Sequence, residues 1–260
     1  MKVCYFPGCT LKNKAKELDL YARACAEALG VIMEEPDEWQ CCGGVFSTAC
    51  DEIASKLSAV RALNCAKERG EYLVTVCSAC HNVIKQTNHA MQSDPIFASR
   101  ANNYMMLKEP YRGETKVIHY LELLRDVIGF DGIKRKAVKP LDGIKIAAYY
   151  GCLLLRPESV MQTDDVENPS IMEDFIKALG AEPVIYPYRN ECCGGYVVAE
   201  DRSFAEKKSA KVIESAEENG AQRIVTACPL CKYNLEQAKG KLPVVYITEL
   251  LADVLGIRQN

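Results

Sequence analysis

The sequence predicts an α/β protein built from two homologous βα halves with mostly parallel sheets, related by pseudo-twofold symmetry. Two observations carry this prediction. A pattern of five cysteines occurs twice in the 260 residues, in the same order and with nearly the same spacing. Short apolar segments also alternate with amphipathic ones in both copies, as expected for a parallel sheet with helices on both faces.

The cysteine pattern marks an internal duplication. In each copy a Cys-Cys pair, followed directly by Gly-Gly, is separated by 34 residues from a Cys-x-x-Cys sequence. The surrounding segments match as well, since residues 73–77 (LVTVC) resemble residues 224–228 (IVTAC). Two copies are too few for a solenoid. We therefore expect two domains, 1–135 and 141–260, with the polar stretch 131–143 as the join.

The first half is expected to alternate strands and helices. Strands are predicted at 2–6, 31–33 and 72–76, and helices at 18–29 and 51–69. Leu18, Ala22, Cys25 and Leu29 recur at helical spacing, and Gly30 is a natural helix stop.

The second half repeats this order, with strands at 144–150, 183–186 and 223–226 and helices at 170–179 and 203–219. The resulting fold is Rossmann-like, and ligands of such folds bind beyond the carboxyl ends of the strands. Cys9, Cys77, Cys152 and Cys228 each follow a predicted strand. Each half is therefore expected to bring its cysteines to one edge of its sheet.

The number of cysteines favours iron over disulfide bonds and zinc. A disulfide framework suits short secreted chains, whereas clustered thiols in a chain without a signal-like N-terminus indicate metal or redox sites. A structural zinc ion takes four ligands, but each copy holds five cysteines and only one Cys-x-x-Cys. Iron–sulfur clusters are therefore favoured, with zinc and thiol–disulfide exchange as alternatives.

The local sequence also suits a bulky centre. Neighbouring side chains on an extended strand point to opposite faces, so Cys41 and Cys42 can serve one site only if the backbone turns. Gly43-Gly44 allows that turn and leaves room for a cluster. A Cys-x-x-Cys at the start of a helix directs both sulfurs to one side, where backbone N–H groups favour thiolates.

Composition excludes several functions. The net charge of −3 gives no electrostatic basis for nucleic-acid binding. No segment has the length and hydropathy of a membrane span, so a cytoplasmic protein is expected. Phosphate-binding glycine motifs and the ferredoxin cysteine motif are absent from the sequence. Electrons must therefore come from a partner.

The remaining candidate residues carry weaker signals. Cys4, Cys25, Cys50 and Cys65 are expected to be small buried hydrophobes. His81 follows Cys80, so it is a candidate to hydrogen-bond a cluster sulfur or deliver a proton. His89 and His119 carry no signal. Basic side chains near the cysteines could hold an anionic substrate or offset cluster charge, or could be ordinary surface: Lys12, Lys14, Arg156 and Lys232. Trp39 precedes the first Cys-Cys pair, either as packing or as a shield.

The whole pattern closely resembles the paired "CCG" cysteine-rich domains, and the layout resembles the B subunit of heterodisulfide reductase. This resemblance covers nearly the whole chain. It implies that each half binds a noncubane [4Fe–4S] cluster, giving two clusters per chain. The implied ligands are Cys9, Cys41, Cys42, Cys77 and Cys80 in the first half, and Cys152, Cys192, Cys193, Cys228 and Cys231 in the second.

The resemblance also implies an oxidoreductase that reductively cleaves a (hetero)disulfide between its two clusters. The implied partners are the ferredoxin-like C subunit and the flavoprotein A subunit of such a complex, together with a hydrogenase, a formate dehydrogenase or another oxidoreductase module. Leu153 stands where methanogen members are expected to carry His, which weakens transfer of their coenzyme M–coenzyme B substrate. The alternative is an electron-transfer subunit of a lactate- or glycolate-oxidising complex or another flavin-dependent one.

Overall fold

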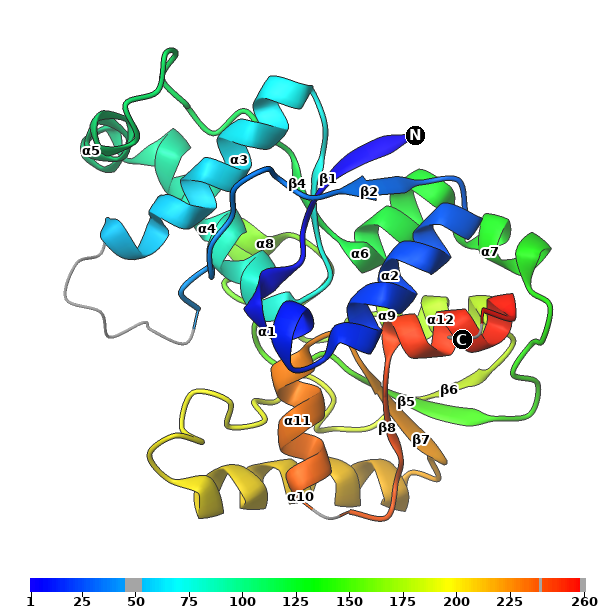
Figure 1. Cartoon of the computed structure of the whole chain (residues 1–260). Helices are drawn as coiled ribbons and strands as arrows, with labels where there is room; N and C mark the ends of the chain where they lie inside the picture. The colour runs from blue at the N-terminus through cyan, green and yellow to red at the C-terminus, as the bar shows by residue number, and fades with distance from the viewer. Residues whose placement is uncertain (45–52, 239, 258–260) are drawn as a thin grey trace.

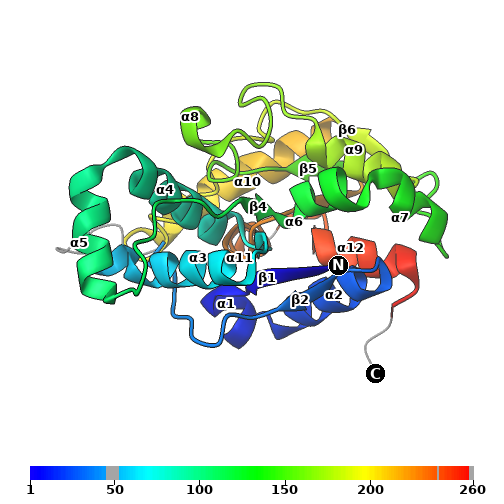
Figure 2. The same ribbon diagram turned by 90° about the horizontal axis from the view of Figure 1, so that it is seen from above.

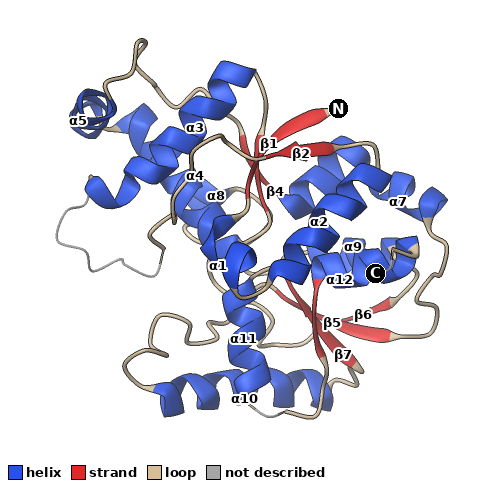
Figure 3. Cartoon of the chain, viewed as in Figure 1, coloured by secondary structure: helices blue, strands red, loops and turns tan. Residues whose placement is uncertain are grey.

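The computed structural model describes residues 1–44, 53–238 and 240–257, which form two four-stranded parallel sheets (Figures 1 and 3). The first sheet has the order β2-β1-β3-β4, with β1 Lys2–Phe6, β2 Ile32–Glu34, β3 Leu73–Thr75 and β4 Val117–His119. The second has the order β6-β5-β7-β8, with β5 Lys145–Tyr149, β6 Glu182–Val184, β7 Arg223–Thr226 and β8 Val244–Tyr246. The shared order confirms the predicted α/β fold with two equivalent halves.

The helices of the two halves also correspond. In the first half they are α1 Gly8–Asn13, α2 Lys16–Ala28, α3 Leu57–Arg69, α4 Ser78–Ser93, α5 Pro95–Met105, α6 Tyr120–Glu122 with the π-helical η2 Leu123–Ile128, and α7 Phe130–Lys136. In the second they are α8 Glu158–Met161, α9 Ile171–Ala178, α10 Arg202–Glu218, α11 Pro229–Gln237 and α12 Ile247–Leu255. Helices α2, α3 and α4 occupy the places that α9, α10 and α11 take in the other half.

Helices of the first half pack directly against helices of the second half. Helix α12 of the second half packs on α2 of the first, and α6 and α7 pack on α9 (Figures 1 and 2). Thr248 donates from its hydroxyl to the carbonyl of Leu18 at 3.2 Å, and the backbone N–H of Val138 donates to the carbonyl of Val254 at 2.8 Å. One continuous apolar core consequently runs through both halves.

Most predicted elements are confirmed, with shifted ends. The helix expected from residue 51 forms α3 from Leu57, after a 3₁₀ turn at Ala54–Lys56, and residues 51 and 52 lie outside the described ranges. The predicted join was too long, because residues 130–136 form α7, whose Ile133 is buried. The short strands β4 and β8 and the helix α5 were not predicted.

Candidate functional site

The carboxyl ends of the two sheets meet near the middle of the molecule. Ser78, just after β3, donates from its backbone N–H and its hydroxyl to the carbonyl of Ala227, just after β7, at 3.2 and 2.9 Å. The hydroxyl of Tyr246 lies 2.6 Å from the carbonyl of Val76 and 3.1 Å from that of Ala227. These contacts place the two Cys-x-x-Cys segments against each other, as expected of ligand sites beyond strand ends.

The five cysteines of the first half lie together. Sulfur–sulfur distances are 3.4 Å between Cys9 and Cys41 and 3.3 Å between Cys42 and Cys80. Cys41 interacts electrostatically with Cys42, and Cys77 with Cys80. Cys9 and Cys41 are half-buried, whereas the other three thiols are buried. All five predicted residues therefore share one place.

The second half repeats the arrangement. The sulfurs of Cys193 and Cys231 are 3.5 Å apart. Cys152 interacts electrostatically with Cys192, and Cys228 with Cys231. Cys152 and Cys192 are the half-buried members, matching Cys9 and Cys41 of the first half.

The two groups approach each other at Cys77 and Cys228, the neighbours of the hydrogen-bonded Ser78 and Ala227. Cys77 of the first group and Cys228 of the second interact electrostatically, and both are buried. All ten predicted cysteines thus belong to two adjoining sulfur groups, and the spacing alone did not predict that the groups adjoin.

Glycines keep side-chain atoms away from the sulfurs. A Cβ on Gly8 would lie 2.8 Å from the sulfur of Cys80, and one on Gly151 would lie 3.1 Å from the sulfur of Cys231. Both glycines have positive φ angles, of 77° and 64°, which other residues rarely adopt. Sequence analysis missed this pair, although a Gly-Cys dipeptide in both copies was its signal.

The predicted turn at Gly43-Gly44 is also present. Gly43 and its counterpart Gly194 have φ angles of 78° and 83°, and the N–H of Gly194 donates to the sulfur of Cys192 at 3.3 Å. These turns let adjacent cysteines serve the same group.

Hydrogen bonds within each group favour thiolates at particular sulfurs. Hydrogen bonds from Cys41 and Cys80 hold the pKa of the Cys42 thiol far below its ordinary value, against the effect of burial. A hydrogen bond from Cys152 likewise lowers the pKa of Cys192 to about 6. The partner thiols shift the other way, because hydrogen bonds and burial raise the pKa values of Cys41 and Cys152. Each of these pairs thus holds one thiolate beside one thiol, and the thiolate is the form in which cysteine binds metals.

A small hollow of about 30 Å³ lies at the second group. Its walls are sulfur and mostly apolar side chains: Ser78, Tyr150, Cys152, Leu153, Cys192, Cys193, Gly195, Tyr196, Cys228, Leu230 and Cys231. Tyr196, which sequence analysis missed, interacts electrostatically with Cys42 of the first group as well as with Cys152 and Cys192. It therefore lies close to both groups.

Most of the basic residues near the cysteines have protein partners. Lys12 pairs with Glu35 at 2.5 Å, and Lys232 pairs with Glu236 at 2.9 Å. Arg156 donates to the carbonyl of Asn190 at 3.0 Å, and Lys14 is exposed. No Lys or Arg lines the hollow within the described part of the chain. The predicted anion-binding role for these side chains is therefore not supported.

His81 is fully buried on α4. Its Nε2 lies 3.4 Å from a carboxylate oxygen of Glu122 without hydrogen-bond geometry, and its ring packs edge-on to His119 at 5.5 Å. Burial holds the pKa of His81 well below its ordinary value, so the imidazole is neutral at physiological pH. This favours hydrogen bonding over proton delivery. His89 is exposed, as its lack of signal suggested.

The other cysteines largely fit their predicted packing role. Cys4 and Cys25 are completely buried in the core, and the half-buried Cys65 packs against it. Cys50 lies outside the described residues.

Known proteins share both the cysteine pattern and the fold. The cysteine-rich domain family CCG matches residues 3–85 and 146–236. The 8-methylmenaquinol:fumarate reductase membrane anchor subunit of Wolinella succinogenes is 31% identical, over 97% of this chain and 92% of its own. The B subunit of the ferredoxin/F420H2-dependent CoB-CoM heterodisulfide reductase of Methanosarcina acetivorans is 28% identical, over 100% and 93%. Lactate utilization protein A 1 of Bacillus cereus is 24% identical, over 96% and 98%.

A solved structure of a hypothetical protein from Helicobacter pylori has the same fold, with a TM-score of 0.73 at 11% identity. This chain spans 49% of its length. In the described ranges of this chain, no helix has the length and apolar character needed to cross a membrane. Together, the match in both halves and the full-length relatives show that the chain belongs to the duplicated CCG cysteine-rich family, which includes the B subunit of heterodisulfide reductase.

Proposed function

We propose that the chain is an iron–sulfur redox subunit in which each cysteine group binds one noncubane [4Fe–4S] cluster. The proposed ligands are Cys9, Cys41, Cys42, Cys77 and Cys80 for the first cluster, and Cys152, Cys192, Cys193, Cys228 and Cys231 for the second. The two halves, taken as domains 1–135 and 141–260, would each hold one cluster.

The residues present fit such a centre. Each group supplies five thiols, one more than a tetrahedral zinc ion uses. The positive-φ glycines Gly8 and Gly151 leave open the space beside Cys80 and Cys231 that a Cβ would fill. Within residues 1–44, 53–238 and 240–257, no three Cys, His, Asp or Glu side chains converge so that they could hold one metal ion, so the preference for iron rests on the number and kind of donors. This donor set supports a multi-iron centre over zinc.

The activity we propose is reductive cleavage of a disulfide at the junction of the two groups. The observation that carries it is the pair of hydrogen bonds from Ser78 to the carbonyl of Ala227, which brings the neighbouring Cys77 and Cys228 together. A substrate bound there lies close to both centres. When bound, the clusters supply the two electrons that convert one disulfide and two protons into two thiols. The chain itself places apolar side chains, Leu153 and Leu230, around the hollow, which keeps water away from the sulfurs.

The proposed assembly follows from the need for electrons. We propose that a ferredoxin-like subunit is the immediate donor and that a flavoprotein subunit reduces it, with a hydrogenase, formate dehydrogenase or similar module as the source. The many reduced thiols suit the cytoplasm. His81 is proposed to support the first cluster as a neutral hydrogen-bonding group.

A second candidate is an electron-relay subunit that never meets the substrate. The small hollow favours it, because about 30 Å³ holds no more than a water molecule or two. The similarity to lactate utilization protein A agrees with this alternative.

Reduced methyl viologen distinguishes the two candidates. The chain is purified anaerobically and mixed with the reduced dye. Each reaction also contains one of three disulfides: the CoB–CoM heterodisulfide, glutathione disulfide or cystine. Disulfide reductase activity predicts two dye molecules oxidised and two thiols released per disulfide. Dye oxidation that reduces the chain's own chromophore but releases no thiol with any disulfide would contradict the catalytic proposal and favour the relay.

A further inference from the structure

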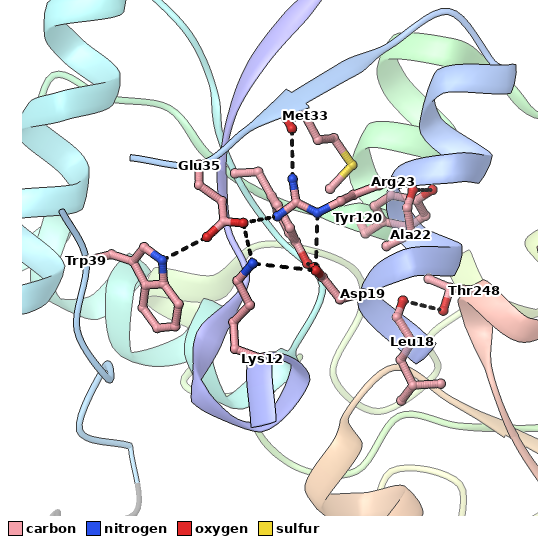
Figure 4. Close-up of polar contacts among 11 residues, drawn as sticks. Lys12, Leu18, Asp19, Ala22, Arg23, Met33, Glu35, Trp39, Tyr120 and Thr248 are labelled. Atoms are coloured by element: carbon pink, nitrogen blue, oxygen red, sulfur yellow. Dashed lines mark hydrogen bonds and ion pairs between the residues drawn. The ribbon is translucent and has the colours of Figure 1, made fainter. Parts of the chain in front are cut away.

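The carboxylate of Glu35 is the meeting point of a polar network beside the first cysteine group (Figure 4). Glu35 follows β2 directly. It accepts hydrogen bonds from Nζ of Lys12 at 2.5 Å and from the indole N–H of Trp39 at 2.9 Å. The guanidinium of Arg23 also donates to it. One carboxylate thus holds three donors from three different segments.

Two of these donors belong to segments that carry cysteines. Lys12 lies on α1, three residues after Cys9, and Trp39 lies two residues before Cys41. These are the cysteines whose sulfurs are 3.4 Å apart. Glu35 therefore connects two segments, far apart in the chain, at the place where their thiols must meet.

Further hydrogen bonds fix the residues of this network in place. Arg23 donates to Asp19 at 3.2 Å and to the carbonyl of Met33 at 3.1 Å, and Tyr5 donates to Asp19 at 2.7 Å. Arg69 donates to the carbonyl of Glu35 at 3.1 Å. Although burial opposes ionisation, the hydrogen bonds from Lys12 and Trp39 keep the pKa of Glu35 below its ordinary value.

The second half joins the equivalent segments by another route. Arg156, four residues after Cys152, donates directly to the carbonyl of Asn190, two residues before Cys192. The position of Glu35, six residues before the Cys-Cys pair, is taken there by the buried Tyr186. Both halves therefore bridge their first cysteine to their Cys-Cys loop, and only the first does so through a carboxylate.

We propose that Glu35 is a positioning residue for the first cluster, fixing the segments of Cys9 and Cys41 at ligand distance. This rests on the proposed binding of clusters by both groups. Because residues that orient ligands typically change metal affinity by about 10- to 100-fold, its loss should be visible in iron retention. The second cluster should be unaffected.

The test compares Glu35→Gln with Glu34→Gln, a neighbouring glutamate that pairs only with Lys2 among the described residues. Each is made in full-length chains that retain one group, using Cys193→Ser to leave the first and Cys42→Ser to leave the second. Iron release to a ferrous chelator and the electron paramagnetic resonance spectrum are measured on anaerobic protein.

We expect Glu35→Gln to release first-group iron about tenfold faster and to alter its spectrum. Release from the second group should not change, and Glu34→Gln should match its parent in both backgrounds. Arg156→Gln should instead speed iron release from the second group and leave release from the first group unchanged. Equal release from Glu35→Gln and its parent, or faster release from both groups alike, would overturn the inference. If the unsubstituted chain binds no iron or sulfide, the proposed function fails instead.

Discussion

The two halves hold the same sulfur arrangement with different supports. In the first, the Cys-Cys loop is tied down by Glu35 and Lys12, whose side chains are 25% and 36% exposed. In the second, Arg189 and Glu173 form an ion pair at 2.7 Å with side chains only 7% and 4% exposed. The shared features are the cysteines and the glycines beside them. The supporting residues differ, so we infer that many local solutions can position the same thiols.

The largest expected difference between the halves comes from removing one central cysteine in each. Cys42→Ser should abolish the first cluster and Cys193→Ser the second, because each is a buried proposed ligand whose sulfur lies within 3.5 Å of the second cysteine of its Cys-x-x-Cys. We expect each variant to keep about half of the roughly eight irons of two [4Fe–4S] clusters. Iron and acid-labile sulfide analysis of anaerobic protein measures this. Full iron and sulfide in either variant would contradict the ligand assignment.

The supports themselves should differ in their contribution to stability. Glu173→Gln leaves the charge of Arg189 buried without its partner, which typically costs about 3–5 kcal/mol of unfolding free energy. Lys12→Gln removes a partly exposed pairing with Glu35, which keeps its bonds from Arg23 and Trp39, so about 1 kcal/mol or less is expected. Urea unfolding under anaerobic conditions compares them. Equal losses would show that burial does not distinguish the two networks.

A pair of glycines separates backbone strain from crowding of the sulfurs. Gly8 and Gly30 have φ angles of 77° and 88°, so Ala at either should cost about 1 kcal/mol or more in strain. Only the new Cβ at position 8 meets a sulfur, that of Cys80 at 2.8 Å, whereas Gly30 has open space. Gly8→Ala should therefore lose iron while Gly30→Ala keeps it. Gly151→Ala, with a 3.1 Å contact, should lose less. If Gly30→Ala also loses iron, backbone strain alone explains the loss and crowding of the sulfur is not needed.

The last comparison concerns pH and sets His119 against Tyr246, its counterpart. Burial lowers the pKa of His119 to about 4, against about 6.5 in an unfolded chain. Between these values the unfolded chain binds the proton and the folded chain does not, so stability falls as the pH drops from 6.5 to 4, by roughly 3 kcal/mol. In the second half Tyr246 does not titrate in this range.

His119→Asn keeps an acceptor for the N–H of Leu121, which His119 caps at 3.2 Å. Unfolding free energies at pH 7.5 and 5 should differ less in this variant than in the parent chain. An unchanged pH dependence would show that His119 is not responsible.

Local patterns accounted for much of the fold. The strands before Cys77 and Cys228 are β-branched runs that are visible in the sequence. Because the sequence is duplicated, each strand pattern occurs twice and supports the other. By contrast, β4 and β8 have the same length of three residues as β3, but no cysteine follows them to mark where a strand ends. The packing of α12 on α2 between the halves was not predictable, because it depends on contacts between distant segments.

The candidate site also has features that the sequence predicts and features that it does not. Spacing alone grouped the ten cysteines into two sets of five, because ligand chemistry and the duplication both restrict where such cysteines can stand in the sequence. The approach of Cys77 to Cys228 and the bridge through Glu35 arise only when separate loops meet in space. A charged residue such as Glu35 carries no local sign of its partners, so the sequence left open whether Lys12 holds a substrate, offsets cluster charge or lies on an ordinary surface.

Iron and acid-labile sulfide per chain test the central claim most directly. Protein purified anaerobically, with full occupancy, is predicted to contain about eight of each, as two [4Fe–4S] clusters require. Zinc in place of iron, with no sulfide, would contradict the account.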